Sequence, residues 1–162
     1  ELDKLCAFVG SGEITKETVE SVAVKSVDAS VYEYVRQIFA GNISEALKML
    51  DDMFFLRIEP MAILYITASS YTDMYRISAA NKAGVSKADV ASDFSYPKNK
   101  LFLLDTALRN LRKFDSKKLR YSLQALAAAD KTLKSFGAEP KTVLEQLTVK
   151  LVYILTKGES VD

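Results

Sequence analysis

The chain contains no histidine and no tryptophan, and Cys6 is its single cysteine. Without histidine, the sequence lacks both the commonest general base and the commonest metal ligand. One cysteine cannot form an internal disulfide or supply a cysteine-rich zinc site, so we interpret Cys6 as a small buried hydrophobic residue. Such sparing use of cysteine is typical of a reducing compartment, and we expect a cytoplasmic protein.

Helix breakers are also scarce, because the 162 residues include only three prolines and six glycines. Apolar residues recur at helical spacing, and no segment alternates between apolar and polar residues as a strand would. No apolar run approaches the ~20 residues needed to span a bilayer, so no membrane association is expected. The sequence therefore predicts an all-α fold, with a hydrophobic content of 49%, enough for a core.

Glycine and proline mark the expected helix ends. Pro60, Pro97 and Pro140 suit the first turns of helices, and Gly41 and Gly84 suit their ends. The run Ser30-Val31-Tyr32-Glu33 has the spacing of a capping box, which predicts a helix starting there. Two helices are expected before about residue 27 and seven after it, so a boundary is predicted near that point.

One carboxylate falls on an expected apolar stripe. Asp130 follows Leu123 by seven residues and Leu119 by eleven, so the helical repeat places all three on one face. An unpaired buried carboxylate is costly, so we expect a partner for Asp130, more from another helix than from Lys134. We interpret Asp130, Lys134 and Glu145 as structural polar residues and not as catalytic acids.

The segment 97–120 is strongly basic. Eight lysines and arginines lie there against only Asp105 and Asp115, although the whole chain carries a net charge of +1. Basic side chains at helix ends can contact phosphates, which makes five residues candidate DNA contacts: Arg109, Arg112, Lys113, Lys117 and Lys118. The alternative, which we favour, is that these residues solvate amphipathic helices and compensate helix dipoles.

Other patterns do not indicate catalysis. The loop Gly10-Ser11-Gly12-Glu13 lacks the Gly-Lys-Ser/Thr ending of a phosphate-binding loop. Asp51 and Asp52 are adjacent, so on a helix their side chains point about 100° apart. We expect no catalytic residue, no cofactor and no metal, and therefore no enzyme activity in this part of the chain.

Several short motifs, taken in order, resemble the C-terminal part of the bacterial DNA polymerase III delta subunit family, a component of the sliding-clamp loader. The helical hairpin of this family resembles Ile38-Phe39-Ala40-Gly41-Asn42 followed by Ala46-Leu47 and Leu50. Glu59-Pro60 with Ile63-Leu64 is similar to the start of its long helix. Its final helix pair resembles Leu123, Leu126, Asp130, Leu133-Lys134 and Leu144-Glu145.

The resemblance implies a compact helical bundle of the collar type at residues 28–162, preceded at 1–27 by two helices ending an AAA+ lid domain. It also implies a role in replication as a collar that binds the gamma/tau and delta-prime subunits, within a DNA polymerase III holoenzyme. A missing N-terminal module would contact the sliding clamp, and primer-template DNA is a further possible partner. Five aromatic residues near the edges of the apolar stripes are candidates for the subunit interface: Tyr32, Tyr34, Phe55, Tyr65 and Tyr153.

Two alternatives stay open at this stage. The chain could be a helical DNA-binding domain that uses the basic segment 97–120, which would give strongly salt-dependent affinity. It could also be the tail of another AAA+ ATPase, in which case the upstream sequence would carry a Walker lysine.

Overall fold

The computed structural model describes residues 27–159, and every regular element in that range is a helix. The all-α prediction is therefore confirmed for this part of the chain. The two helices expected at 1–27, together with Cys6 and the loop at Gly10–Glu13, lie outside the described residues apart from Val27.

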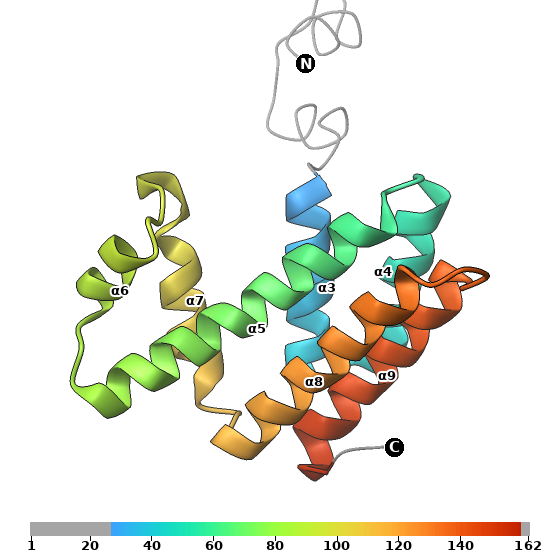
Figure 1. Ribbon diagram of the computed structural model, residues 1–162. Helices are drawn as coiled ribbons and strands as arrows, with labels where there is room; N and C mark the ends of the chain where they lie inside the picture. Colours follow the sequence, from blue (N-terminus) through green and yellow to red (C-terminus); the bar gives the residue numbers. More distant parts are fainter. Residues whose placement is uncertain (1–26, 160–162) are drawn as a thin grey trace, which may run out of the picture.

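Figure 1 shows the elements in chain order. They are α3 (Val27–Ala40), α4 (Ile43–Phe55), α5 (Pro60–Ala83), α6 (Lys87–Asp93), the short 3₁₀ helix η1 (Lys98–Lys100), α7 (Phe102–Leu111), α8 (Ser116–Leu133) and α9 (Pro140–Lys157).

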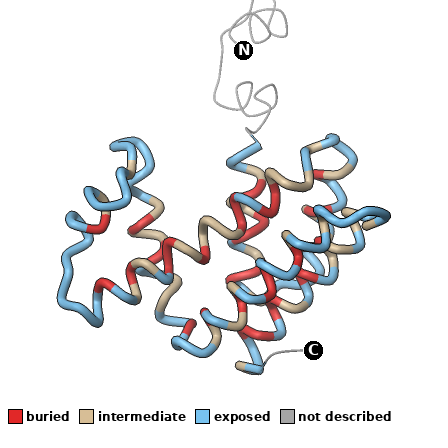
Figure 2. The backbone as a smooth tube through the Cα atoms, in the orientation of Figure 1, coloured by how far each residue is buried: buried red, intermediate tan, exposed pale blue. Residues whose placement is uncertain are grey.

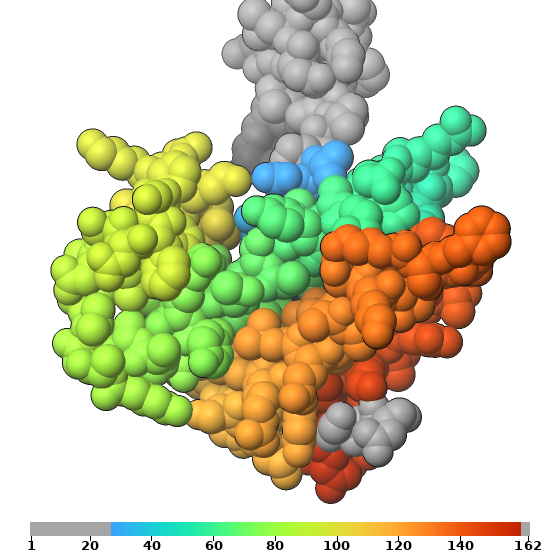
Figure 3. Space-filling view, viewed as in Figure 1, coloured from blue at the N-terminus to red at the C-terminus, as the bar shows by residue number. Residues whose placement is uncertain are grey.

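The long helix α5 organises the molecule. On one side it packs against α3, α8 and α9, and α4 joins this bundle by packing on α3 and α9. On the other side it carries α6 and α7, which with η1 form a smaller lobe (Figure 1). The helices α5 and α8 lie next to each other across the face shown in Figure 3. Because the bundle and the smaller lobe both pack on α5, side chains on both flanks of α5 line the surfaces of the molecule.

Local signals explain most of the helix ends. Pro60 and Pro140 occupy the first turns of α5 and α9, and Gly84 ends α5 in the left-handed conformation with φ 70°. Ser86 and Asp89 form a capping box on α6, and the Asp115 carboxylate caps α8.

Two predicted helix starts are wrong. Ser30 lies inside α3, which begins at Val27, so its hydroxyl is not the cap. Pro97 starts η1 and not a full α-helix, and α7 begins only at Phe102. The segment before Pro97 is a turn in which Ser95 has a φ of 52°, and η1 lies between Pro97 and α7.

The core lies where α3, α5, α8 and α9 meet, as the buried segments in Figure 2 show. Three aromatic rings contact one another edge to face at its centre, because Phe39, Tyr71 and Phe114 have centroids 5.1–5.7 Å apart. Phe114 follows α7, so this cluster attaches the start of the α7–α8 turn to the bundle.

Candidate interaction surfaces

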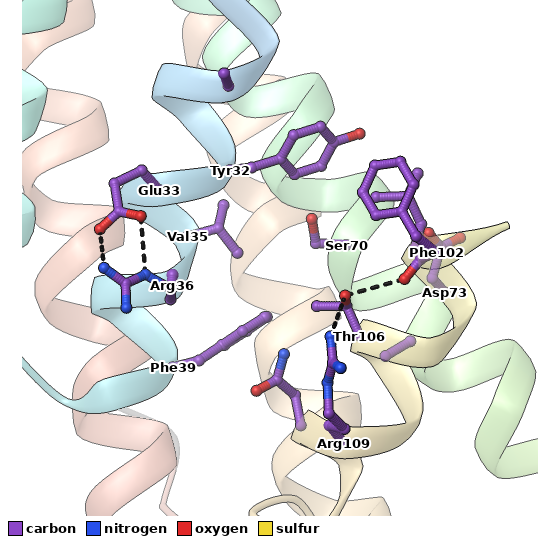
Figure 4. Close-up of a pocket in the computed structure, with 14 residues that line it drawn as sticks. Tyr32, Glu33, Val35, Arg36, Phe39, Ser70, Asp73, Phe102, Thr106 and Arg109 are labelled. Atoms are coloured by element: carbon purple, nitrogen blue, oxygen red, sulfur yellow. Dashed lines mark hydrogen bonds and ion pairs between the residues drawn. The ribbon is translucent and has the colours of Figure 1, made fainter. Parts of the chain in front are cut away.

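A hollow of about 490 Å³ lies between α3 and α7, with α5 as its floor (Figure 4). Tyr32 from α3 and Phe102 from α7 reach toward each other at one end, while Phe39 and Arg109 lie toward the other. The helices α3 and α7 both pack on α5, which leaves the space between them to be lined by side chains. The hollow can therefore receive apolar side chains from outside.

A second hollow of about 650 Å³ adjoins the first and shares Tyr32, Asp73 and Leu103 with it. Four aromatic residues line it: Tyr32, Tyr65, Phe94 and Tyr96. We call the two hollows together the aromatic trough. Tyrosine and phenylalanine at such density are typical of the centres of protein interfaces.

A buried carboxylate fixes one wall of the trough. Asp73 on α5 is only 6% exposed, and its Oδ1 atom accepts a hydrogen bond from the Tyr96 hydroxyl. The Arg76 Nη1 atom donates to the Tyr96 Oη atom at 2.8 Å and lies 3.5 Å from Asp73 Oδ1. The Arg76 guanidinium also lies over the Phe94 ring, 4.2 Å from its centroid. These contacts hold the turn before η1 against α5.

The surroundings of Asp73 act on its pKa in opposite directions. Burial raises the pKa of the Asp73 carboxyl above its ordinary value, while the Tyr96 hydroxyl and the Arg76 guanidinium partly offset that rise. Burial and the hydrogen bond to Asp73 likewise raise the pKa of Tyr96. The buried Asp73 carboxylate therefore has a structural role in this surface, since it contacts both Tyr96 and Arg76.

Sequence reasoning missed Asp73, although the same signal was present there. Asp73 lies seven residues after Ile66 and four before Ile77, and both of these residues are buried on α5. Asp73, like Asp130, therefore follows the apolar repeat of its helix, and the Asp73 carboxylate does lie on a covered face.

The predicted partner of Asp130 is wrong, and the structure shows which ion pairs Asp130 and Glu145 form. The Asp130 side chain is 42% exposed, and Lys134 Nζ is 2.7 Å from its Oδ2 atom, so its partner lies on the next turn and not on another helix. Glu145 lies 3.8 Å from Lys141 Nζ, which makes a closer contact of 2.6 Å with Asp51. Both acids belong to exposed ion pairs of modest strength.

The five candidate interface aromatics separate in the structure. Tyr32 and Tyr65 come together in the second hollow, whereas Phe55 lies at the end of α4 with 87% of its surface exposed and Tyr153 is exposed on α9. Tyr34 was assigned to the interface wrongly, because it is fully buried and its hydroxyl bonds to Thr148. Its place on α3 directs it inward between α3 and α9.

The five candidate DNA contacts are also used in different ways. Lys113 Nζ donates to the Phe39 carbonyl at the end of α3, and Lys118 Nζ donates to the Leu155 carbonyl near the end of α9, each at 2.8 Å. Arg109 donates to Thr106 Oγ1 at 3.0 Å at the edge of the first hollow. Arg112 is exposed, and the Lys117 ammonium lies 5.6 Å from the Tyr121 ring centroid. Two of the five therefore compensate the C-terminal ends of other helices.

Residues 27–159 include no helix with both the length and the apolar character needed to cross a bilayer. In the same range, no three acidic or cysteine side chains come together as a metal site would require.

The chain is similar to known proteins along its whole length. It is 25% identical over 164 residues to a DNA polymerase III subunit delta from Bacillus subtilis, in an alignment that covers 100% of this chain and 45% of that protein. Its fold matches a Bacillus subtilis DNA clamp loader delta protein with a TM-score of 0.78 and 22% identity, over 93% of this chain and 44% of that one. The chain thus spans a little under half the length of both relatives.

The family comparison covers the same region as the described helices. Residues 28–151, more than half of the chain, match the family described as the DNA polymerase III delta subunit, C-terminal domain. The helical hairpin of α3 and α4, the long α5 and the final pair α8 and α9 all fall within or across that match. The chain therefore belongs to the family formed by the C-terminal domains of DNA polymerase III delta subunits.

Proposed function

We propose that this domain is an assembly module of a bacterial clamp loader and binds sister subunits of the gamma/tau and delta-prime type as part of a collar. In this role it performs no catalysis itself. In the complete subunit, an N-terminal module would contact and open the sliding clamp. Family membership also favours this branch over the tail of another AAA+ ATPase.

The aromatic trough is the observation that carries the proposal. Two adjoining hollows are lined by aromatic residues from three directions: Tyr32 on α3, Tyr65 on α5 and Phe102 at the start of α7. Tyr65 and Phe102 are more than half exposed, which is costly for apolar surface unless a partner covers it. Helices of a neighbouring protein in the assembly that pack against this trough would bury those rings.

The direct test is assembly of the complete delta subunit with its gamma/tau and delta-prime partners. The double variant Tyr32→Ser with Phe102→Ser should weaken assembly at least tenfold, as expected for loss of two aromatic anchors. Val85→Ser, which removes an exposed apolar residue from the α5–α6 turn, serves as the matched control. If the double variant assembles as well as the control while both remain folded, the trough is not the interface.

A second candidate function is contact with primer-template DNA by the basic segment 97–120. Of its candidate residues, Arg109, Arg112 and Lys117 keep their charges at the surface without bonding to a helix end. Changing these three residues to Glu should lower DNA affinity and reduce its dependence on salt. Lys113 and Lys118 stay unchanged in this experiment, because their loss would disturb the fold. Equal affinity and an equal salt slope would eliminate this function.

A further inference from the structure

The seam between α5 and α8 forms a second surface, which shares Tyr65 with the aromatic trough. The two helices run antiparallel, because Met61 and Lys134 line one end of the seam while Lys82 and Ser116 line the other. Lys82 Nζ lies 2.6 Å from Ser116 Oγ at the latter end. Two hollows of about 400 and 610 Å³ follow the seam and adjoin each other, because Leu123 and Ala127 line both. We call the two hollows together the α5–α8 seam; its helices lie side by side in Figure 3.

The seam has the length and shape of a helix-binding site. From Met61 to Lys82 an α-helix rises about 32 Å at 1.5 Å per residue, so an occupant helix of about 20 residues would span it. The floor contains small residues, among them Ala68, Ala79 and Ala127, which allow a third helix to approach closely. Tyr65 and Tyr75 rise beside it, 72% and 55% exposed, and offer aromatic anchors.

Charge distinguishes the two ends of the seam. At the Met61 end, Asp130 and Lys134 pair with each other and leave no net charge. At the Ser116 end, Lys82 and Arg120 line the hollow, and no carboxylate of residues 27–159 forms an ion pair with either. Asp115, next to Ser116, caps α8 by accepting a hydrogen bond from the Lys118 N–H, and with its single negative charge counted, Lys82 and Arg120 still leave this end of the seam positive. An occupant therefore needs an apolar middle and an acidic end.

We propose that the α5–α8 seam binds an amphipathic α-helix of about 20 residues from a partner protein, with an apolar stripe along the seam and an acidic end against Lys82 and Arg120. This site lies on the opposite flank of α5 from the first hollow of the aromatic trough, and the proposal does not depend on the function proposed for the trough.

The test measures binding of designed peptides to the 162-residue chain by fluorescence anisotropy. The probe is a 20-residue helical peptide with a leucine stripe and three glutamates at one end, and its match carries lysines in place of the glutamates. We expect the acidic peptide to bind at least tenfold more tightly than the basic one, with a difference that shrinks as salt rises.

Variants of the chain test whether this preference for the acidic peptide arises at the seam. Lys82→Glu with Arg120→Glu should abolish or reverse it, whereas Lys48→Glu with Lys150→Glu makes the same charge change on α4 and α9 and should leave it intact. Ala127→Arg should weaken both peptides at least tenfold by filling the floor. Circular dichroism of each variant verifies that the helices are retained.

Three results of the peptide-binding experiment would overturn the proposal. These are failure of the acidic peptide to bind, equal affinity for the two peptides, and a preference that survives Lys82→Glu with Arg120→Glu. A dimer in sedimentation that Ala127→Arg dissociates would also overturn it, because the seam would then bind a second copy of this chain.

Discussion

The Tyr34 hydroxyl on α3 lies 2.6 Å from Thr148 Oγ1 on α9, across 114 positions of the chain. Thr148 donates its own hydroxyl to the Leu144 carbonyl at 2.7 Å, so the Tyr34 hydroxyl is the donor in the first bond. Burial raises the pKa of Tyr34 to about 12. The Tyr34–Thr148 pair therefore stays neutral at physiological pH, and it joins α3 to α9.

Replacing Tyr34 by Phe should lower the free energy of unfolding by about 1 kcal/mol, because one buried neutral hydrogen bond is lost. Tyr71→Phe is the matched control: the Tyr71 hydroxyl is equally enclosed but makes no hydrogen bond of normal geometry within residues 27–159, although it interacts with the Ser122 side chain. Its removal should change the free energy of unfolding by less than about 0.5 kcal/mol or raise it. Urea denaturation measures both, and equal losses would contradict the assignment.

Asp73→Ala removes the acceptor of the Tyr96 hydroxyl and the counter-ion of Arg76. We expect a loss of about 1–3 kcal/mol in the free energy of unfolding, since a partly buried network is broken. Asp130→Ala removes a carboxylate from an exposed pair and should cost less than about 0.5 kcal/mol. If Asp130→Ala lowers the free energy of unfolding in urea denaturation more than Asp73→Ala does, Asp73 is not the structurally more important carboxylate of the two.

The raised pKa of Asp73 also predicts a pH dependence. The folded state holds this proton more tightly than the unfolded state, so the contribution of the group is fully present below the ordinary carboxyl pKa. It is lost as the pH rises through the folded-state value. The Asp73→Asn variant does not titrate at this position. The difference in the free energy of unfolding, variant minus unaltered chain, should therefore increase between about pH 4 and pH 7. A constant or decreasing difference across this range would show that ionised Asp73 is favoured by the fold.

Replacing the two lysines that bond to helix ends should lower the stability more than replacing their exposed neighbours. Lys113→Met and Lys118→Met each remove a charged donor from a carbonyl at the C-terminal end of another helix, and we expect each to cost about 1 kcal/mol in stability. Arg112→Met and Lys117→Met make the same kind of change at the surface and should stay within about 0.5 kcal/mol. Thermal unfolding of the four variants separates the two groups, and uniform effects would argue against the helix-end bonds.

Much of the fold could be predicted because its signals are local. Pro60, Gly84, Asp115 and Pro140 act within one helical turn, so their positions alone predict where helices begin and end. The start of α7 was harder to predict, because the turn before it depends on contacts that Tyr96 makes with α5, 20 or more residues away.

The surfaces depend on which helix faces are covered, and periodicity does not determine this. Asp73 and Asp130 have equivalent spacing to apolar neighbours, but only the Asp73 face is covered, by the turn that carries Tyr96. Tyr34 and Tyr32 are two residues apart on α3, yet one points into the core and the other lines the aromatic trough. Only the tertiary arrangement distinguishes such pairs.

The aromatic trough and the α5–α8 seam share Tyr65. Its ring borders both the second hollow of the aromatic trough and the α5–α8 seam. A side chain that is held by a partner on one flank of α5 is no longer available to a partner on the other, so we expect antagonism between the two binding events. A single tyrosine would then let one association report on the other without any movement of the backbone.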